Sequence, residues 1–155
     1  MKHTFVFHSI SLAKKIQKSV GFKSLPLDLS YSEACALLVI ASSQEINQKE
    51  IASKLHLEPA SIVSLIDELG KNGLVSRESP NGDRRKYRIV LTKLGKIKVK
   101  HIKNKTYKLD NLLRKQLTPK EEASFESILK KLNAYLAEWK GGENEIPGTK
   151  RYLAS

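Results

Sequence analysis

The segment from residue 47 to residue 95 constrains the fold more than any other part of this chain of 155 residues. Its hydrophobic spacing predicts a short helix over residues 48–55 and, after a turn, a longer helix over residues 59–72. Asn47, with Glu50 three residues later, has the spacing of a capping box at the start of the first helix. A glycine follows the second helix, as is typical of a helix end. Two helices joined by a short turn are therefore expected.

Two short strands are expected after these helices, over residues 74–78 and 86–91. The segment between them, Ser79 to Lys86, is dense in turn-forming residues and predicts the tip of a hairpin. Arg77 and Arg88 lie on the flanking strands, so the whole hairpin is basic. Two helices that can be presented to a groove, with a basic hairpin beside them, are the parts of a winged helix-turn-helix. They predict double-stranded DNA as the partner.

Further helical patterns flank this segment. One covers residues 5–20, and one follows Ser30, which forms a second capping-box pattern with Glu33. A long helix is expected from Thr92 to about residue 116, and a last one from Thr118-Pro119 to about residue 139. The first and last helices carry apolar faces that a small winged helix cannot cover, which predicts a dimer interface. Its expected residues are Phe5, Leu12, Ile16, Phe125, Leu129, Leu132, Leu136 and Trp139.

The expected fold class is α+β and mostly helical. Residues 1–28 are expected to form a dimerisation helix and loop, and residues 29–92 the winged helix-turn-helix. Residues 93–140 are expected to form long C-terminal dimerisation helices, followed by a mobile tail over residues 141–155. These parts together make one intertwined domain.

The formal net charge of +12 and the isoelectric point near 9.8 favour a polyanionic partner. Nucleic acid comes first and an anionic membrane surface second. No run of about eighteen apolar residues exists, so no segment is expected to span a bilayer. The N-terminus lacks the features of a signal peptide, and a single cysteine suits a reducing compartment. The expected location is the cytoplasm.

An ordered set of short motifs runs through most of the chain: Leu29-Ser30, Leu37-Leu38, Gln48-Lys49-Glu50-Ile51-Ala52 with Leu55, Ser61-Ile62, Leu65-Ile66-Asp67-Glu68-Leu69, Gly73-Leu74-Val75 with Arg77, Asp83-Arg84-Arg85, Leu91-Thr92 with Gly95, and Leu117-Thr118-Pro119 with Glu122. This set resembles the MarR family, the multiple-antibiotic-resistance type of bacterial regulators. The resemblance reaches to about Trp139, and its specificity lies in the order of the motifs. It implies an obligate homodimer that binds a pseudo-palindromic operator and, in many members, is released by a small molecule or an oxidant.

The helix over residues 59–72 is the candidate recognition helix. Its N-terminal, outward face offers small side chains to base edges. The candidate contacts are Pro59, Ala60, Ser61, Val63 and Ser64. The family often has a hydroxyl where Val63 stands and an arginine where Ser64 stands, so sequence preference is expected to rest more on DNA shape and on the hairpin. The alternative is a set of small solvated residues.

The basic hairpin supplies the second group of candidate contacts: Arg77, Asp83, Arg84, Arg85 and Lys86. An extended arginine at the tip can enter a narrow minor groove, where the negative potential is enhanced. The resemblance assigns that role to Arg85, with Asp83 as the carboxylate that orients it. The alternative is a solvated charged turn.

The long helix carries seven lysines outside its apolar stripe: Lys93, Lys96, Lys98, Lys100, Lys103, Lys105 and Lys108. Those nearest Thr92 are expected to contact phosphates, and a solvated face is expected for the distal ones. Ala34, Cys35 and Leu38 are the candidates for an effector pocket, because relatives commonly have a bulky aromatic at the position of Ala34. Cys35 is expected to be a small packed residue rather than a redox sensor.

No Ser/His/Asp arrangement, phosphate-binding glycine loop or pair of catalytic carboxylates is found, so neither an enzyme nor a cofactor is expected. The four histidines and Cys35 lack the spacing of a metal site. The leading hypothesis is a homodimeric transcriptional regulator, a repressor released by a small molecule. The alternatives left open are a sequence-tolerant architectural DNA binder, a winged-helix module for protein interaction, and a membrane-surface role for the long helix.

Overall fold

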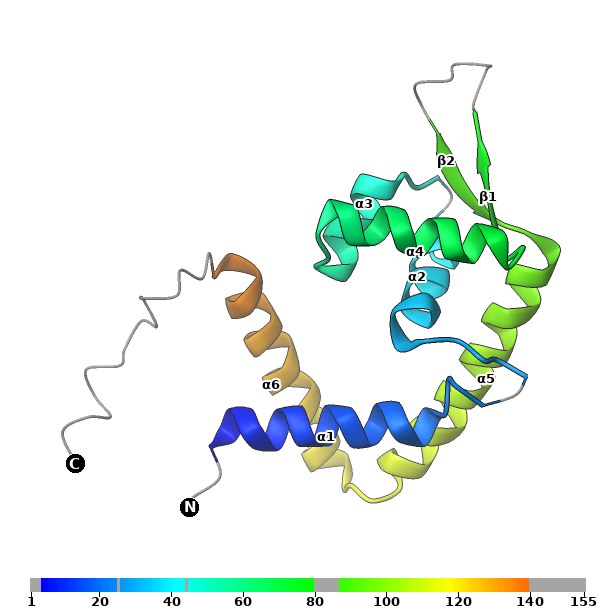
Figure 1. The fold of residues 1–155 in the computed structure, drawn as a ribbon. Helices are drawn as coiled ribbons and strands as arrows, with labels where there is room; N and C mark the ends of the chain where they lie inside the picture. The colour runs from blue at the N-terminus through cyan, green and yellow to red at the C-terminus, as the bar shows by residue number, and fades with distance from the viewer. Residues whose placement is uncertain (1–3, 25, 44, 80–86, 140–155) are drawn as a thin grey trace. The chain divides into compact units, whose positions relative to one another are not determined.

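The computed structural model describes residues 4–24, 26–43, 45–79 and 87–139, which form eight helices and strands in two compact units, Met1–Asp110 and Asn111–Ser155. The elements in chain order are α1 (Phe5–Val20), α2 (Tyr31–Ala41), α3 (Gln48–Leu55), α4 (Pro59–Lys71), β1 (Val75–Glu78), β2 (Arg88–Leu91), α5 (Lys93–Arg114) and α6 (Pro119–Glu138) (Figure 1). The described chain is mostly helical with a small sheet, and the prediction of a winged helix is confirmed.

Three helices start with capping boxes, of which those at Ser30 and Asn47 were predicted as such. In each, the side chain of the residue before the helix accepts a hydrogen bond from an N–H of the first turn, and a glutamate carboxylate accepts one from the backbone N–H of the cap residue. The pairs are Ser30 with Glu33, Asn47 with Glu50, and Thr118 with Glu121. These reciprocal bonds satisfy N–H groups that have no partner within the helix, which explains why sequence spacing located the starts.

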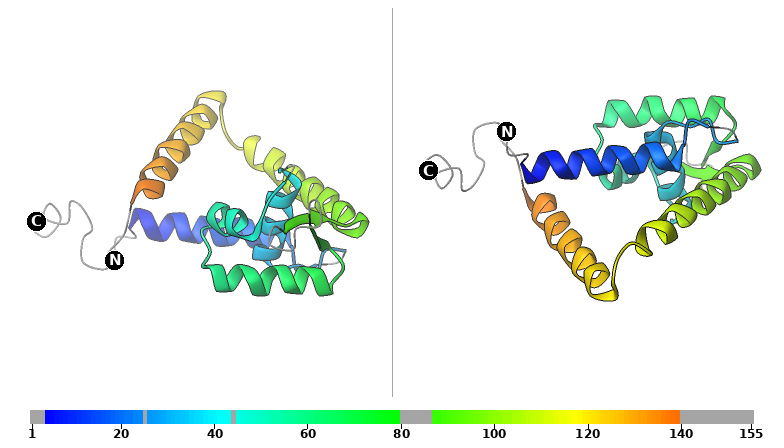
Figure 2. Two further views of the ribbon diagram at one scale, coloured as in Figure 1. Left: turned by 90° about the horizontal axis from the view of Figure 1, so that it is seen from above. Right: turned by 90° about the horizontal axis from the view of Figure 1, so that it is seen from below.

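The core of the first unit lies where α2, α3 and α4 pack on one another and on the sheet (Figure 1, Figure 2). α4 turns Ile62, Ile66 and Leu69 into this core. α2 has several packing partners, and Ala34, Ala36, Leu37 and Ile40 are all buried. A helix covered on more than one side has no single apolar stripe, so its burial does not follow a simple helical periodicity.

The loop between α1 and α2 also enters the core, because Phe22, Leu27 and Leu29 are buried there. Leu27 is 1% exposed and Leu29 is 2% exposed. The Leu29 N–H donates to the carbonyl of Phe22 at 2.9 Å, which closes the loop on itself. This connection is therefore a packed part of the unit, although its glycine and proline predicted only a loop.

The sheet consists of β1 and β2, antiparallel, with a register that pairs Val75 with Leu91 and Glu78 with Arg88. Both strands are shorter than predicted, since Leu74 and Tyr87 lie outside them. β2 gains a further neighbour on its other side, where the Ile89 N–H donates to the carbonyl of Ile46 at 2.8 Å. The predicted hairpin tip, residues 80–86, lies outside the described residues.

Close hydrogen-bonded contacts around Thr92 join the end of the sheet to α5. The hydroxyl of Thr92 accepts from the Gly95 N–H at 3.0 Å and donates to the carbonyl of Gly73 at 2.6 Å. The Thr92 N–H donates to the carbonyl of Leu74 at 3.1 Å. A Cβ on Gly95 would lie 2.0 Å from that same carbonyl oxygen, so only glycine fits this position. The predicted cap at Thr92 is confirmed, and the structure gives the reason for Gly95.

The second unit contains the last turn of α5 and all of α6. Arg114 pairs with Glu122 and, at 3.4 Å, with Glu126, which ties the two helical segments together. α6 ends at Glu138, and Trp139 follows in extended conformation. The expected glycine stop at residues 141–142 and the tail lie outside the described residues.

Candidate nucleic-acid interface

The predicted recognition residues lie together on the first turns of α4. Pro59, Ala60, Ser61, Val63 and Ser64 are all exposed, whereas Ile62 between them is buried at 1% exposure. The alternation follows from the helical repeat, which turns the buried residue to the core and leaves its neighbours outside. The first turns of α4 thus present a narrow surface of small side chains.

The same end of α4 has properties that suit an anion. Glu58, the residue before the helix, makes no side-chain capping hydrogen bond within the described residues. The N–H groups of Ala60 and Ser61 have no partner within the helix, and they carry the positive end of its dipole. A phosphate oxygen can accept from such groups.

The hydroxyl of Ser64 already donates a hydrogen bond within α4. It donates to the carbonyl of Ala60 one turn earlier, at 3.3 Å. In this arrangement its lone pairs remain available, so Ser64 can accept a hydrogen bond from a base amino group. The structure thus favours the acceptor role for the Ser64 hydroxyl.

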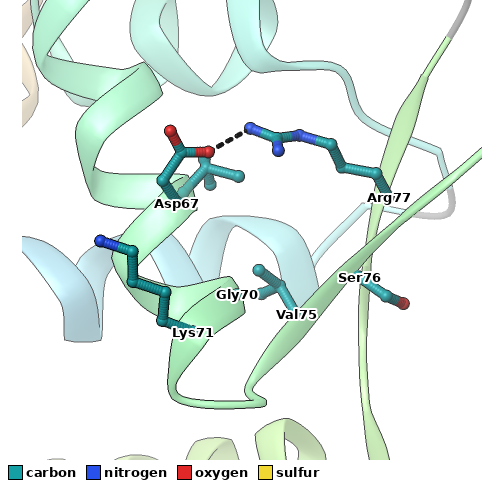
Figure 3. Close-up of a pocket in the computed structure, with 7 residues that line it drawn as sticks. Asp67, Gly70, Lys71, Val75, Ser76 and Arg77 are labelled. Atoms are coloured by element: carbon teal, nitrogen blue, oxygen red, sulfur yellow. Dashed lines mark hydrogen bonds and ion pairs between the residues drawn. The ribbon is translucent and has the colours of Figure 1, made fainter.

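Arg77 on β1 has a carboxylate partner that sequence analysis missed. Its guanidinium forms an ion pair with Asp67 on α4 at 2.5 Å (Figure 3). The pair borders a hollow of about 410 Å³ lined also by Gly70, Lys71 and Ser76. Both side chains are more than two-fifths exposed, so the pair is a surface contact. The ion pair links the first strand of the hairpin to the candidate recognition helix, and the carboxylate of Asp67 partly neutralises the positive charge of Arg77.

Arg88 on β2 is held by two carboxylates and is not part of a free basic surface. Its guanidinium donates to Glu78 at 2.9 Å and 3.1 Å and to Glu45 at 2.7 Å. The hydrogen bonds that Arg88 donates to Glu78, and then the one that it donates to Glu45, raise the pKa of Arg88 above its usual value. These bonds join both strands to the segment before α3 at the end of the sheet that leads into the hairpin tip.

The remaining hairpin candidates, Asp83, Arg84, Arg85 and Lys86, lie outside the described residues. The structure describes the two strands that carry them, and their roles stay predictions. Lys93 and Lys96, the lysines nearest Thr92 on α5, are exposed.

Two other lysines of α5 differ from their expected solvated state. Lys98 donates to the carbonyls of Pro26 and Leu27, and Lys105 donates to the carbonyl of Gly21 and to the hydroxyl of Ser24. Their partners lie 71 to 84 residues away in sequence, so no local pattern could have signalled these contacts.

The three residues of the expected effector pocket lie on α2. Ala34 is fully buried, while Cys35 and Leu38 are half-buried. The hydrogen bond with Cys35 raises the pKa of Tyr31, one turn earlier, and partial burial adds to the rise. Because Ala34 is closed within the core, a ligand could reach it only after a movement of the surrounding side chains. The pocket stays a prediction.

The candidate dimer residues are mostly exposed within each unit. Phe5 and Leu12 on α1 are 66% and 47% exposed, and Ile16 is half-buried. On α6, Leu132 is half-buried, and Phe125, Leu129 and Leu136 are exposed, as is Trp139 directly after the helix. Large exposed apolar surfaces are typical of association sites, and the role of these residues in a dimer stays a prediction.

In the described part of the chain, the histidine, cysteine and acidic side chains form no group of three or more that could hold a metal ion. Over the same residues, no helix has the length and apolar character needed to cross a membrane.

Comparison with known proteins gives a family match and a fold. The model of the MarR family matches residues 29–87. The HTH-type transcriptional regulator SarZ of Staphylococcus saprophyticus is 30% identical over 92 residues, which are 59% of this chain and 62% of that protein. SarZ of Staphylococcus haemolyticus is 26% identical over 83 residues, or 54% and 56% of the two chains. This chain thus spans less than two thirds of the length of these curated relatives.

The fold is shared with the Staphylococcus aureus protein MepR in the crystal structure of its DNA complex. The TM-score is 0.78 at 19% identity, over 86% of this chain and 99% of MepR. At that identity the likeness concerns the fold, including the helices outside residues 29–87. The family match over residues 29–87, the two SarZ relatives and the common fold make the winged-helix part of this chain similar to MarR-family regulators.

Proposed function

We propose that this protein is a homodimeric, DNA-binding transcriptional regulator of the cytoplasm, acting as a repressor at a pseudo-palindromic operator. The observation that carries the proposal is the exposed first turns of α4 beside a two-stranded hairpin. A relative of the same fold is described in a complex with DNA, and the SarZ relatives are described as transcriptional regulators.

In the proposed complex, α4 enters the major groove with its N-terminal end. Ser61 and Ser64 face base edges, and Val63, 44% exposed, contacts a thymine methyl group. The hairpin tip enters the adjacent minor groove through Arg85, oriented by Asp83. Lys86, Arg84 and the first lysines of α5 contact phosphates, which position the protein without reading sequence.

The proposed dimer uses the apolar faces of α1 and α6, whose exposed residues need a partner surface. Release by a small molecule would act through the region of α2 around Cys35 and Leu38, which are half-buried and near the core. A ligand that binds more tightly to a conformation whose two recognition helices do not match the spacing of the operator half-sites would weaken operator binding.

The experiment that tests the function is selection of bound fragments from random DNA, followed by footprinting on the selected sequence. A protected pseudo-palindrome supports the regulator. In gel-shift titration on that site, Arg85→Ala should lower affinity by about 1–3 kcal/mol and weaken the A·T preference of the flanks. Unchanged affinity and flank preference would remove the hairpin tip from the mechanism.

A sequence-tolerant architectural DNA binder is the second candidate. The net charge of +12 favours it, and so do the small side chains of α4 and the internal hydrogen bond of Ser64. Selection from random DNA separates the two functions, because an architectural binder would yield no common site. It would instead show similar affinity for scrambled duplexes at every salt concentration.

A further inference from the structure

Two lysines of α5 bind the backbone of the loop that follows α1. The Lys105 ammonium donates to the carbonyl of Gly21 at 3.1 Å and to the hydroxyl of Ser24 at 2.7 Å. The Lys98 ammonium donates to the carbonyl of Leu27 at 2.9 Å and to that of Pro26. Each lysine therefore uses two of its three N–H groups on this loop. We call these four contacts the α1–α5 clasp.

The α1–α5 clasp contacts both ends of the loop that follows α1. Gly21 is the C-cap of α1 and has a φ of 65°, so Lys105 lies at the negative end of that helix dipole. Leu27 lies at the other end of the loop, where its side chain is buried in the core. The two lysines are seven residues apart, about two helical turns, and so project from one side of α5.

The loop that the clasp holds is ordered by its own hydrogen bonds. Ser24 donates from its N–H to the carbonyl of Gly21 at 3.1 Å, and its carbonyl accepts from the Leu27 N–H at 3.0 Å. A charged donor binds such carbonyls more strongly than a neutral one does. The exit of α1 is thereby attached to α5 at two points, within a unit where α5 itself is attached to the sheet through Thr92.

We infer that Lys98 and Lys105 are positioning residues that set the distance between the two DNA-binding halves of the dimer. The inference rests on the proposed function. α1 carries an exposed apolar face assigned to the dimer, and α5 starts at the hairpin assigned to DNA. A connection between them transmits the geometry of the dimer to the recognition helices. Because their ammonium groups face the loop, these two lysines make no phosphate contact.

The test compares Lys98→Met and Lys105→Met with Lys100→Met and Lys103→Met, which remove the same charge from exposed positions of the same helix. Each variant is titrated on the selected operator and on duplexes whose half-site separation is changed by one or two base pairs. The wild type and both controls should prefer the natural separation. In Lys98→Met and Lys105→Met, the ratio of affinity for the natural separation to affinity for the altered separations should fall about tenfold, which is the scale of coupling between linked sites.

Salt dependence gives a second readout. The clasp variants should keep the wild-type slope of log affinity against log salt, whereas each phosphate contact that is lost removes about 0.9 from the slope. A slope that flattens for Lys98→Met or Lys105→Met, as for a phosphate contact, overturns the inference.

Two further variants keep the test informative if a methionine variant fails to fold. Ser24→Ala removes one acceptor and leaves both charges, so a smaller loss of spacing preference is expected. Lys105→Arg retains charge and donors and should restore most of the preference. If folded clasp variants bind every duplex equally more weakly, with unchanged spacing preference, their role is only structural and the inference is overturned. If the wild type prefers no operator, the proposed function fails and this inference fails with it.

Discussion

At the scale of single residues, the charges around α4 and the hairpin are arranged in pairs. Arg77 and Arg88 look like free basic groups in the sequence, but carboxylates of α4, β1 and the segment before α3 hold them. Surface pairs of this kind contribute little to stability. Their larger effect is on how much positive charge remains available to a polyanion, and Asp67 is the residue that controls this for Arg77.

Asp67→Asn is expected to increase affinity for random duplex DNA. The substitution releases Arg77 from its carboxylate, which adds one phosphate contact per subunit and steepens the salt slope by about 0.9 for each contact. Titration of scrambled duplex at several salt concentrations measures this. The control is Glu68→Gln, which removes the same charge from the next position of α4, where Glu68 lies 3.9 Å from Lys71. An equal steepening in both variants would mean that net charge alone is responsible.

Gly95→Ala is expected to destabilise the fold by roughly 1–3 kcal/mol, the range for overpacking a close contact. The added methyl group would meet the carbonyl of Leu74, which is backbone and cannot turn aside. Gly70→Ala is the matched control, since a Cβ there meets nothing within 4 Å and the residue lies in α4. Alanine should stabilise that helix by about 0.5–1 kcal/mol. Urea unfolding of both variants measures the difference, and equal effects would contradict the role of Leu74.

At the scale of helices and strands, the sequence predicted the features that depend on residues close together in the chain. Each capping box, at Ser30, Asn47 and Thr118, joins two residues that are three positions apart in the chain, and such local patterns located these helix starts. α2 was predicted less completely because its burial depends on neighbours distant in sequence. The ends of the strands depended on pairing, which the residues of one strand do not encode alone.

The candidate site divides in the same way. The exposed side of α4 followed from the helical repeat, because Ile62 faces the core and its neighbours do not. The partners of Arg77, Arg88 and Lys105 come from other elements, so identity and spacing could not reveal them. The sequence thus predicted which surface is presented, and the structure showed which of its charges are already paired.

Glu121→Gln is expected to lower the melting temperature at neutral pH and to have a vanishing effect in acid. The hydrogen bonds from Thr118, backbone first, lower the pKa of Glu121 below its usual 4.5. The ionised carboxylate therefore stabilises the fold above that usual value, and the contribution is lost as pH falls through the lower, folded value. Thermal unfolding followed by circular dichroism at several pH values measures it.

The control for that experiment is Glu138→Gln, at the opposite end of α6. An acid at the C-terminal end of a helix is unfavourable to its dipole, so this change should not lower the melting temperature at neutral pH. A Glu121→Gln effect that persisted unchanged in acid would show that the capping box does not depend on ionisation.

At the scale of the whole molecule, α1 and α6 each expose large apolar side chains, which the proposed dimer would cover. Leu136→Glu places a charge on the exposed face of α6, where Leu136 is 55% exposed, and should dissociate the proposed dimer. Ala134→Glu adds the same charge at an exposed position about half a turn away and should leave the dimer intact. Light scattering at micromolar concentration gives the mass. A monomeric wild type would contradict the dimer, and equal dissociation by both variants would contradict the use of this face.

The junction around Leu74 also determines where the chain tolerates added length. Val75 pairs with Leu91, Thr92 binds the carbonyl of Leu74, and Gly95 passes over that same carbonyl. One inserted residue between Leu91 and Gly95 would rotate the glycine about 100° around α5 and put a side chain against the carbonyl. A tag or reporter loop inserted there would break the contact between sheet and helix.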